Sequence, residues 1–148
     1  MGIWITISLL TASAGYSEPP VTLCHLLENS EKYNGKEVTV RATWKYGFEW
    51  SQIYCIDCPE HGLTWLDVPS DLDDASEKAL KRIPAAGIVN LTVHGIFKSG
   101  GHFGHLGYPH QLVAQRVSDV AVISRGLKNR AKEKELEARF ACGGQNPK

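Results

Sequence analysis

The sequence predicts a mainly β protein: a five-stranded barrel with a helix between the third and fourth strands, a short helix before it and a charged helix after it. Segments of alternating apolar and polar residues recur along the chain, which is typical of half-buried strands. A helical pattern interrupts them once, after the third such segment. The chain has 148 residues, 43% of them hydrophobic, which suffices for one domain with a single core.

The first 20 residues differ from the rest of the chain. Residues 3–10 form an uncharged apolar run, and Ala12 and Ala14 follow it at the small positions of an A-x-A-like cleavage site. This pattern is typical of a secretory signal peptide and is too short to span a bilayer. No Lys or Arg precedes the run, so the n-region is weak, and an N-terminal strand is the alternative. We expect residues 1–20 to be a signal peptide and leader of a secreted or periplasmic protein.

The next segment predicts the entry into the barrel. Leucines at helical spacing favour a short helix over residues 21–29, with Thr22 as its N-cap. Asn34 and Gly35 predict a tight turn, because glycine adopts a positive φ without strain. Residues 36–46 then alternate and predict the first strand, with one face made of Val38, Val40, Ala42 and Trp44.

The middle of the chain supplies two strands and the inserted helix. The strands are expected over residues 52–56 and 63–68. The helix is expected over residues 71–83, with Ser70 or Asp71 as its cap and basic residues in its last turns.

The last part of the predicted barrel holds the strand with the clearest alternation, residues 88–97. A glycine-rich loop over residues 99–109 connects it to a final strand over residues 111–123. Residues 125–148 change to a charged helical pattern with few apolar positions, which predicts a C-terminal extension. The domain boundaries that follow are 1–20, 21–124 and 125–148.

This order of elements is that of the OB-fold, a five-stranded, partly open barrel. Residues 26–44 resemble the helix, turn and first strand of small OB-like domains in uncharacterised exported bacterial proteins, and residues 89–123 resemble their fourth and fifth strands. The resemblance covers residues 21–124 and implies a shape similar to that of the nucleic-acid-binding OB group. One fold hosts many functions, so the resemblance implies the fold and not the ligand.

Aromatic and His side chains gather in two of the expected connections. In an OB-fold, the loops between strands one and two and between strands four and five flank the ligand face. Aromatic rings beside polar groups suit flat or ring-shaped ligands. The alternative is that these rings fill the barrel. The candidate ligand-binding residues are Trp44, Tyr46, Trp50, His102, Phe103, His105 and Tyr108.

The cysteines have three interpretations. Cys55 and Cys58 form a C-x-x-C pair, which in an exported protein favours a structural disulfide between them. As an alternative metal site, the pair has His61 as its nearest third ligand, and zinc is the metal expected. A redox dithiol lacks the thioredoxin-like context that it needs. Cys24 and Cys142 are isolated, and four cysteines allow three pairings, so the connectivity stays open.

The charge is zero only because two parts of the chain cancel. Residues 1–124 carry 9 basic and 13 acidic residues, a balance of −4, and residues 125–148 carry 7 basic and 3 acidic residues, a balance of +4. An acidic body has no electrostatic attraction for phosphate backbones, so nucleic acid is disfavoured as a partner of the barrel.

No common catalytic motif is present. The chain lacks a G-x-S-x-G elbow, an H-E-x-x-H helix, a P-loop and a dinucleotide fingerprint, so an enzyme is the less favoured class. We expect an exported, non-enzymatic module that binds a small molecule, an oligosaccharide or a protein segment, without a cofactor. The alternatives are a zinc-binding module, a structural or protein-interaction module, and nucleic-acid binding by analogy of shape.

Overall fold

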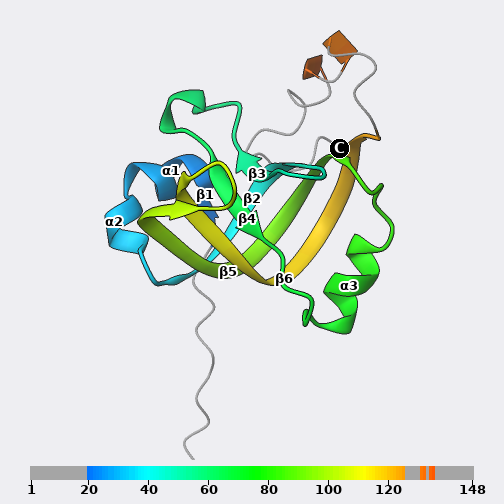
Figure 1. The fold of residues 1–148 in the computed structure, drawn as a ribbon, viewed down its shortest axis with the longest axis horizontal. Coiled ribbons are helices and arrows are strands. Elements are labelled where there is room, and N and C mark those ends of the chain that lie inside the picture. The colour runs from blue at the N-terminus through cyan, green and yellow to red at the C-terminus, as the bar shows by residue number, and fades with distance from the viewer. Residues whose placement is uncertain (1–19, 126–130, 133, 136–148) are drawn as a thin grey trace, which may run out of the picture.

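The computed structural model describes residues 20–125, 131–132 and 134–135 (Figure 1). The predicted signal peptide and most of the predicted C-terminal helix, including Cys142, lie outside the described residues. The described residues 131–132 and 134–135 are helical and exposed. Within the described part of the chain, no helix is long and apolar enough to cross a membrane.

The described chain forms a closed barrel of five strands, with a sixth strand outside it. The barrel order is β2-β3-β4-β6-β5, and β5 pairs with β2 to close the ring. The strands β4 and β6 are parallel, and the other barrel pairs are antiparallel. The elements are β1 (Val21–Thr22), α1 (Leu23–Glu28), α2 (Ser30–Tyr33), β2 (Glu37–Tyr46), β3 (Ser51–Tyr54), η1 (Pro59–His61), β4 (Thr64–Asp67), α3 (Asp74–Leu80), β5 (Gly87–Phe103) and β6 (Tyr108–Ser124).

This architecture confirms the predicted fold class. The barrel is mainly β and OB-like in shape, and α3 lies between its third and fourth strands. Closure depends on β2, which pairs with β5 along its whole length and with β3 through Thr43–Tyr46. One long strand therefore joins both sides of the sheet.

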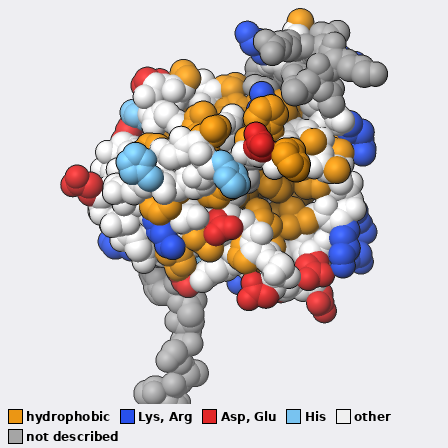
Figure 2. All heavy atoms as spheres, in the orientation of Figure 1, with side chains coloured by type: hydrophobic (Ala, Val, Ile, Leu, Met, Phe, Trp, Pro, Cys, Tyr) orange, Lys and Arg blue, Asp and Glu red, His pale blue; other side chains and the backbone are white. Residues whose placement is uncertain are grey.

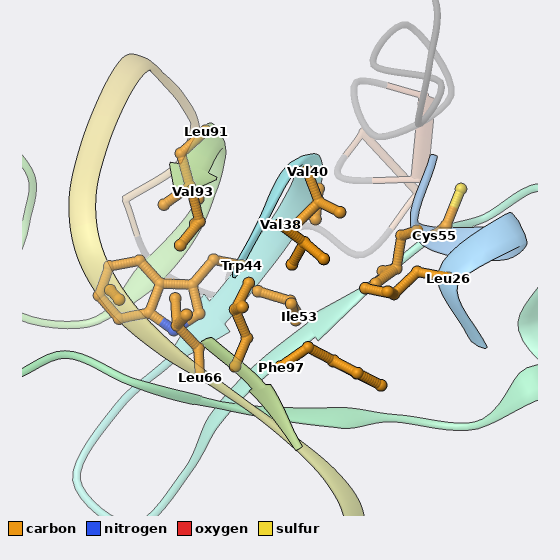
Figure 3. Close-up of a cluster of buried hydrophobic side chains, with 14 of the residues drawn as sticks. Leu26, Val38, Val40, Trp44, Ile53, Cys55, Leu66, Leu91, Val93 and Phe97 are labelled. Atoms are coloured by element: carbon orange, nitrogen blue, oxygen red, sulfur yellow. The ribbon is translucent and has the colours of Figure 1, made fainter. Parts of the chain in front are cut away.

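The core lies inside the barrel and follows the predicted alternation of β2. The side chains of Val38, Val40, Ala42 and Trp44 are buried and meet those of β3, β4 and β5 (Figure 3). Leu23, Leu26 and Leu27 of α1 belong to the same cluster, so the N-terminal helix joins the core through its leucines, as their spacing predicts.

The helices are shorter than predicted. The segment 21–29 begins with β1, which pairs with β2, and the helical turn starts after it, where the Thr22 hydroxyl accepts the predicted capping hydrogen bond from His25 N at 3.1 Å. The predicted cap of α3 at Ser70 or Asp71 is wrong. Asp73 caps α3 instead, because its carboxylate accepts a hydrogen bond from Ser76 N at 2.7 Å.

The predicted glycine-rich loop is wrong over most of its length. Strand β5 continues to Phe103 and β6 starts at Tyr108, so only residues 104–107 form the turn. Phe103 pairs with Tyr108 and Ser99 pairs with His110. The register shifts between Ser99 and Phe103, where Gly100 has φ 74°, so the glycines lie at an irregularity inside the strand pair and do not end it. The result is a long hairpin that extends beyond the barrel wall.

Candidate ligand-binding face

The outer face of β3 and β4 carries the most distinctive group of side chains. Alternation turns Ile53 and Leu66 into the core, so Gln52 and Trp65 point away from it. The strand register places Gln52 beside Trp65 and Trp65 beside Gln111 of β6. Three side chains from three strands thus form a row across the barrel, with an indole ring in the middle.

The Trp65 ring is held in place by the β5–β6 hairpin. The Tyr108 ring stacks on it, with centroids 5.9 Å apart and planes at 28°, and the His105 ring meets it edge-on at 6.1 Å. Gly104, at φ 66°, lies so close that a Cβ there would overlap the indole atoms Cε3 and Cδ2. The hairpin therefore packs on Trp65 while the ring stays partly exposed.

Polar groups surround this ring. The Tyr108 hydroxyl donates a hydrogen bond to Gln52 Oε1 at 2.8 Å, and Gln111 Nε2 donates one to Asp67 Oδ2 at 3.4 Å. Burial raises the pKa of Tyr108, so its hydroxyl remains a donor at neutral pH. An aromatic ring with amides and a carboxylate around it can stack on an apolar ring face and hydrogen-bond to hydroxyl groups at its edge.

The molecular surface agrees with this description. Over the face on which the β5–β6 hairpin lies, hydrophobic side chains gather near the centre with His side chains beside them, and Lys and Arg lie toward the edges (Figure 2). The neighbouring β2–β3 connection adds Trp50, of which 43% is exposed, and Phe48, of which 99% is exposed.

Two of the predicted ligand residues lie elsewhere. Trp44 is 7% exposed and stacks on Tyr46 at 4.1 Å in the core. Trp44 Nε1 donates to Ser51 Oγ at 2.9 Å, and the Tyr46 hydroxyl donates to the Pro84 carbonyl at 2.8 Å. These rings have protein partners on the inner side of β2, so for them the alternative of barrel filling is the correct one.

The other predicted ligand residues lie on the surface or in the hairpin. Trp50, His102 and His105 are exposed, and Phe103 is half-buried with its ring over Gly101. Tyr108 is buried but keeps contact with Trp65. The structure brings His105 and Tyr108 together on Trp65.

Trp65 itself was absent from the predicted set, as were Gln52, Asp67 and Gln111. The predicted strand 63–68 already alternates, and it places Trp65 on the face opposite Leu66. The outward position of a Trp on a short strand was therefore the sequence feature that could have identified Trp65 as a candidate ligand residue. The partners of that ring come from β3 and β6, and no local pattern identifies them.

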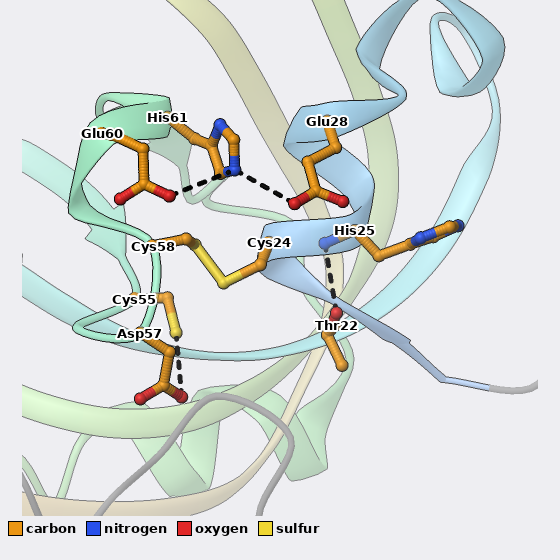
Figure 4. The surroundings of a disulfide bond; sticks show 9 residues. All are labelled: Thr22, Cys24, His25, Glu28, Cys55, Asp57, Cys58, Glu60 and His61. Atoms are coloured by element: carbon orange, nitrogen blue, oxygen red, sulfur yellow. Dashed lines mark hydrogen bonds and ion pairs between the residues drawn. A yellow bond between two sulfur atoms is a disulfide. The ribbon is translucent and has the colours of Figure 1, made fainter.

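The disulfide joins Cys24 to Cys58, with Cα atoms 5.7 Å apart, and the predicted bond between Cys55 and Cys58 is wrong (Figure 4). Helix α1 carries Cys24 and lies against the η1 segment that follows Cys58, so these two residues meet although 34 positions separate them. A disulfide is present in the protein, as expected, but it fastens the N-terminal helix to the β3–β4 connection.

Two of the three predicted zinc ligands, Cys55 and Cys58, lie close to each other, together with Cys24, whereas His61 lies beside Glu28 and Glu60. The Sγ atoms of Cys24, Cys55 and Cys58 lie within 4.8 Å of one another. Zinc binds thiolates, and the disulfide withdraws Cys24 and Cys58 from that role. His61 Nε2 lies 3.2 Å from Glu28 Oε1 and 3.5 Å from a Glu60 oxygen. Zinc binding at Cys55, Cys58 and His61 stays a prediction for the reduced protein alone.

One histidine of the hairpin, His110, is half-buried. His110 stacks on Phe97 with centroids 5.6 Å apart, and its Nδ1 is buried without a hydrogen-bond partner among the described residues. Burial disfavours the imidazolium and lowers the pKa of His110 below its ordinary value of 6.5.

We expect acidification to weaken the fold through His110. The pKa of His110 is lower in the folded protein than in the unfolded chain. Above pH 6.5 its contribution to the free energy of unfolding is fully present. Below that pH the unfolded chain binds the proton first, so the free energy of unfolding falls. The free energy of unfolding in urea at pH 7.5 and at pH 5.5 measures this. In His110→Phe, the loss on acidification should be smaller than in the wild type. His102→Gln, a change at an exposed histidine, should keep the full loss, and an equal pH dependence of all three proteins would refute the assignment.

Comparisons with protein-family models, with curated proteins and with solved structures found no match to this chain. The barrel and its outer face are therefore the basis for assigning a function.

Proposed function

We propose that this protein is an exported, non-enzymatic OB-like module that binds an oligosaccharide on the outer face of β3 and β4. The observation that carries the proposal is the partly exposed Trp65 ring, held by Tyr108 and His105 and bordered by Gln52 and Asp67. Sugar rings have an apolar face that stacks on an indole and hydroxyl groups that pair with amides and carboxylates.

Charge favours a neutral ligand over nucleic acid. Asp67 lies on this face, Glu49 lies in the β2–β3 connection, and the first 124 residues have a balance of −4. Phosphate backbones gain most of their affinity from Lys and Arg, whereas the described ring and hydrogen-bond groups around Trp65 belong to Tyr108, His105, Gln52 and Asp67. The position of the ring, on strands two and three of the barrel, is where OB-folds of many kinds bind oligosaccharides or oligonucleotides.

Export is supported by the Cys24–Cys58 disulfide, which is compatible with an oxidising compartment. The pattern of residues 1–20 is the other support, and the proposal that the barrel belongs to the exported OB-like group depends on both. Mass spectrometry of the protein recovered from an expressing bacterium tests export. A mature N-terminus near Tyr16 in the periplasmic fraction is expected, and an intact Met1 in the cytoplasm would refute it.

Oligosaccharide binding predicts a specific loss on removal of the indole. Titration of the full chain with linear tetrasaccharides of glucose, of N-acetylglucosamine and of uronic acid should give a saturable change in tryptophan fluorescence with at least one of them. Trp65→Ala should weaken that affinity by about 10-fold or more, which corresponds to about 1.4 kcal/mol. Trp65→Phe keeps a stacking surface and should lose less.

The matched control is Val122→Ala, which shortens an exposed apolar side chain on β6 outside this face. Its affinity should equal that of the wild type. Absence of saturation with all three sugars would refute the proposed ligand class, and an equal loss in Trp65→Ala and Val122→Ala would refute the proposed face. Binding that appears only with a single-stranded oligonucleotide, and weakens with salt, would favour the nucleic-acid alternative.

A further inference from the structure

A second indole lies on the outer side of the barrel, at the start of β3 and next to the strand that carries Trp65. Tyr46 points into the core, so Gly47, the next residue, faces outward. A Cβ at Gly47 would lie 2.6 Å from Nε1 of Trp50, so the Trp50 ring lies over Gly47 on the outer side of the β2–β3 hairpin. Gly47 N–H also donates a hydrogen bond to the Trp50 carbonyl at 2.9 Å, which holds the two residues together.

Both indoles of this side of the barrel therefore lie against a glycine. Gly104 lies against Trp65 as Gly47 lies against Trp50, and a Cβ at either glycine would overlap the indole. Glycine leaves the space that a ring needs to lie directly on the backbone. A ring held in this way loses little freedom when a ligand stacks on it, which favours binding. In contrast, Phe48 is 99% exposed, so its ring has almost no contact with the protein.

The two indoles are separate stacking positions. Trp50 lies two residues before Gln52, about 7 Å along the strand direction, and Gln52 lies beside Trp65 at a strand spacing of about 5 Å. The Cα atoms of Trp50 and Trp65 are therefore on the order of 8 Å apart. The ring contacts of Trp65 are with His105 and Tyr108, and among the described residues none joins it to Trp50. One sugar ring cannot stack on both indoles, whereas a chain of linked sugar rings can.

The polar groups of the face favour Trp65 as the position of a short ligand. Amide and carboxylate side chains border Trp65. Next to Trp50, the Ser51 hydroxyl already donates a hydrogen bond to the Leu66 carbonyl at 2.6 Å. A ligand of one ring therefore gains most at Trp65, and Trp50, which is 43% exposed, adds a stacking surface for the rings that follow.

We propose that the ligand of this face is a linear oligosaccharide that covers both indoles, with one ring stacked on Trp65 and a later ring on Trp50, and that Gly47 positions the Trp50 ring. This inference rests on the proposed function and adds to it the length of the ligand. A longer chain gains the second stacking contact without a second loss of translational freedom, so its affinity should exceed that of a single sugar ring.

The dependence of affinity on chain length tests this. The full chain is titrated by calorimetry with the sugar that it binds best, as the methyl monosaccharide and as the tetrasaccharide. In the wild type, the tetrasaccharide should bind at least about 10-fold more tightly than the monosaccharide. Trp50→Ala should weaken tetrasaccharide binding by about 10-fold and change monosaccharide binding by less than about 2-fold, whereas Trp65→Ala should weaken both.

Gly47→Ala tests the position of the ring without removing it. Gly47 does not have a positive φ, so alanine there displaces the end of the Trp50 side chain and does not strain the backbone. This variant should lose tetrasaccharide affinity as Trp50→Ala does, keep its monosaccharide affinity and melt at the wild-type temperature. The matched control is Phe48→Ala, which removes an exposed ring from the same connection and should keep both affinities.

Three results would overturn the inference while tetrasaccharide binding by the wild type still supports the proposed function. They are an unchanged affinity in Trp50→Ala, an equal loss for both ligands in that variant, and an equal loss in Phe48→Ala. If the wild type binds none of the sugars at either length, the proposed function fails, and this inference fails with it.

Discussion

Replacing both Cys24 and Cys58 by Ser is expected to lower the free energy of unfolding by about 3 to 4 kcal/mol. The bond closes a loop of 34 positions and restricts the conformations of the unfolded chain. Removing the bond raises the conformational entropy of the unfolded state and so lowers the free energy of unfolding. The double replacement is preferred to a single one because it leaves no new thiol beside Cys55.

Urea unfolding followed by circular dichroism measures this loss. The matched control keeps the bond and changes a nearby contact: Glu28→Gln, which alters the ion pair with His61 on the same two segments, should cost less than about 1 kcal/mol. An unchanged stability of the double variant would show that α1 stays on the barrel through its buried leucines alone.

Gly95→Ala is expected to destabilise the barrel by about 3 kcal/mol or more. Gly95 lies in β5 at a register shift opposite Ala114, and a Cβ there would overlap the backbone carbonyl of Val113. A backbone carbonyl inside a paired strand cannot rotate away, so β5 and β6 would have to separate.

The same chemical change at Gly100 provides the control. Gly100 has φ 74°, and no atom of the described residues lies within 4 Å of the added Cβ, so alanine there should cost only the strain of the positive φ, about 1 to 2 kcal/mol. Thermal unfolding of both variants separates steric overlap from backbone conformation. A Gly95→Ala variant as stable as Gly100→Ala would contradict the close approach of β5 and β6.

Both changes bear on the candidate face through the elements that support it. Strands β5 and β6 carry the hairpin whose Tyr108 and His105 hold Trp65. The Cys24–Cys58 bond anchors the connection that leads directly into β4. A loss of sugar binding in these two variants would accompany loss of the fold, whereas Trp65→Ala should lose binding while the barrel remains.

Much of the barrel was predictable from local sequence. The alternation in residues 36–46 gives β2 with an error of one residue, and it identifies the inward faces of Val38 and Val40. The Asn34–Gly35 turn was also predictable, and Gly35 has φ 76°. These features repeat every second residue or depend on one backbone angle, so a short window of sequence contains them.

The candidate face was predictable only in part. Tyr108 and His105 were expected to bind a ligand because they stand in the connection between the last two strands. Trp44 and Tyr46 were included for the same reason, but β2 turns them inward. A residue that is close to a loop in sequence can face either side of its strand, and the closed barrel decides which side that is.

By itself, the sequence determined the class of fold, the order of its strands along the chain and the division into an acidic body and a basic C-terminal segment. Tertiary structure alone decided that Cys58 bonds to Cys24, and that Trp65 lies between Gln52 and Gln111. The reason is physical: periodicity is a property of neighbouring residues, whereas pairing depends on strand register and on where a helix docks. Register and docking minimise the energy of the whole barrel, and no single segment encodes them.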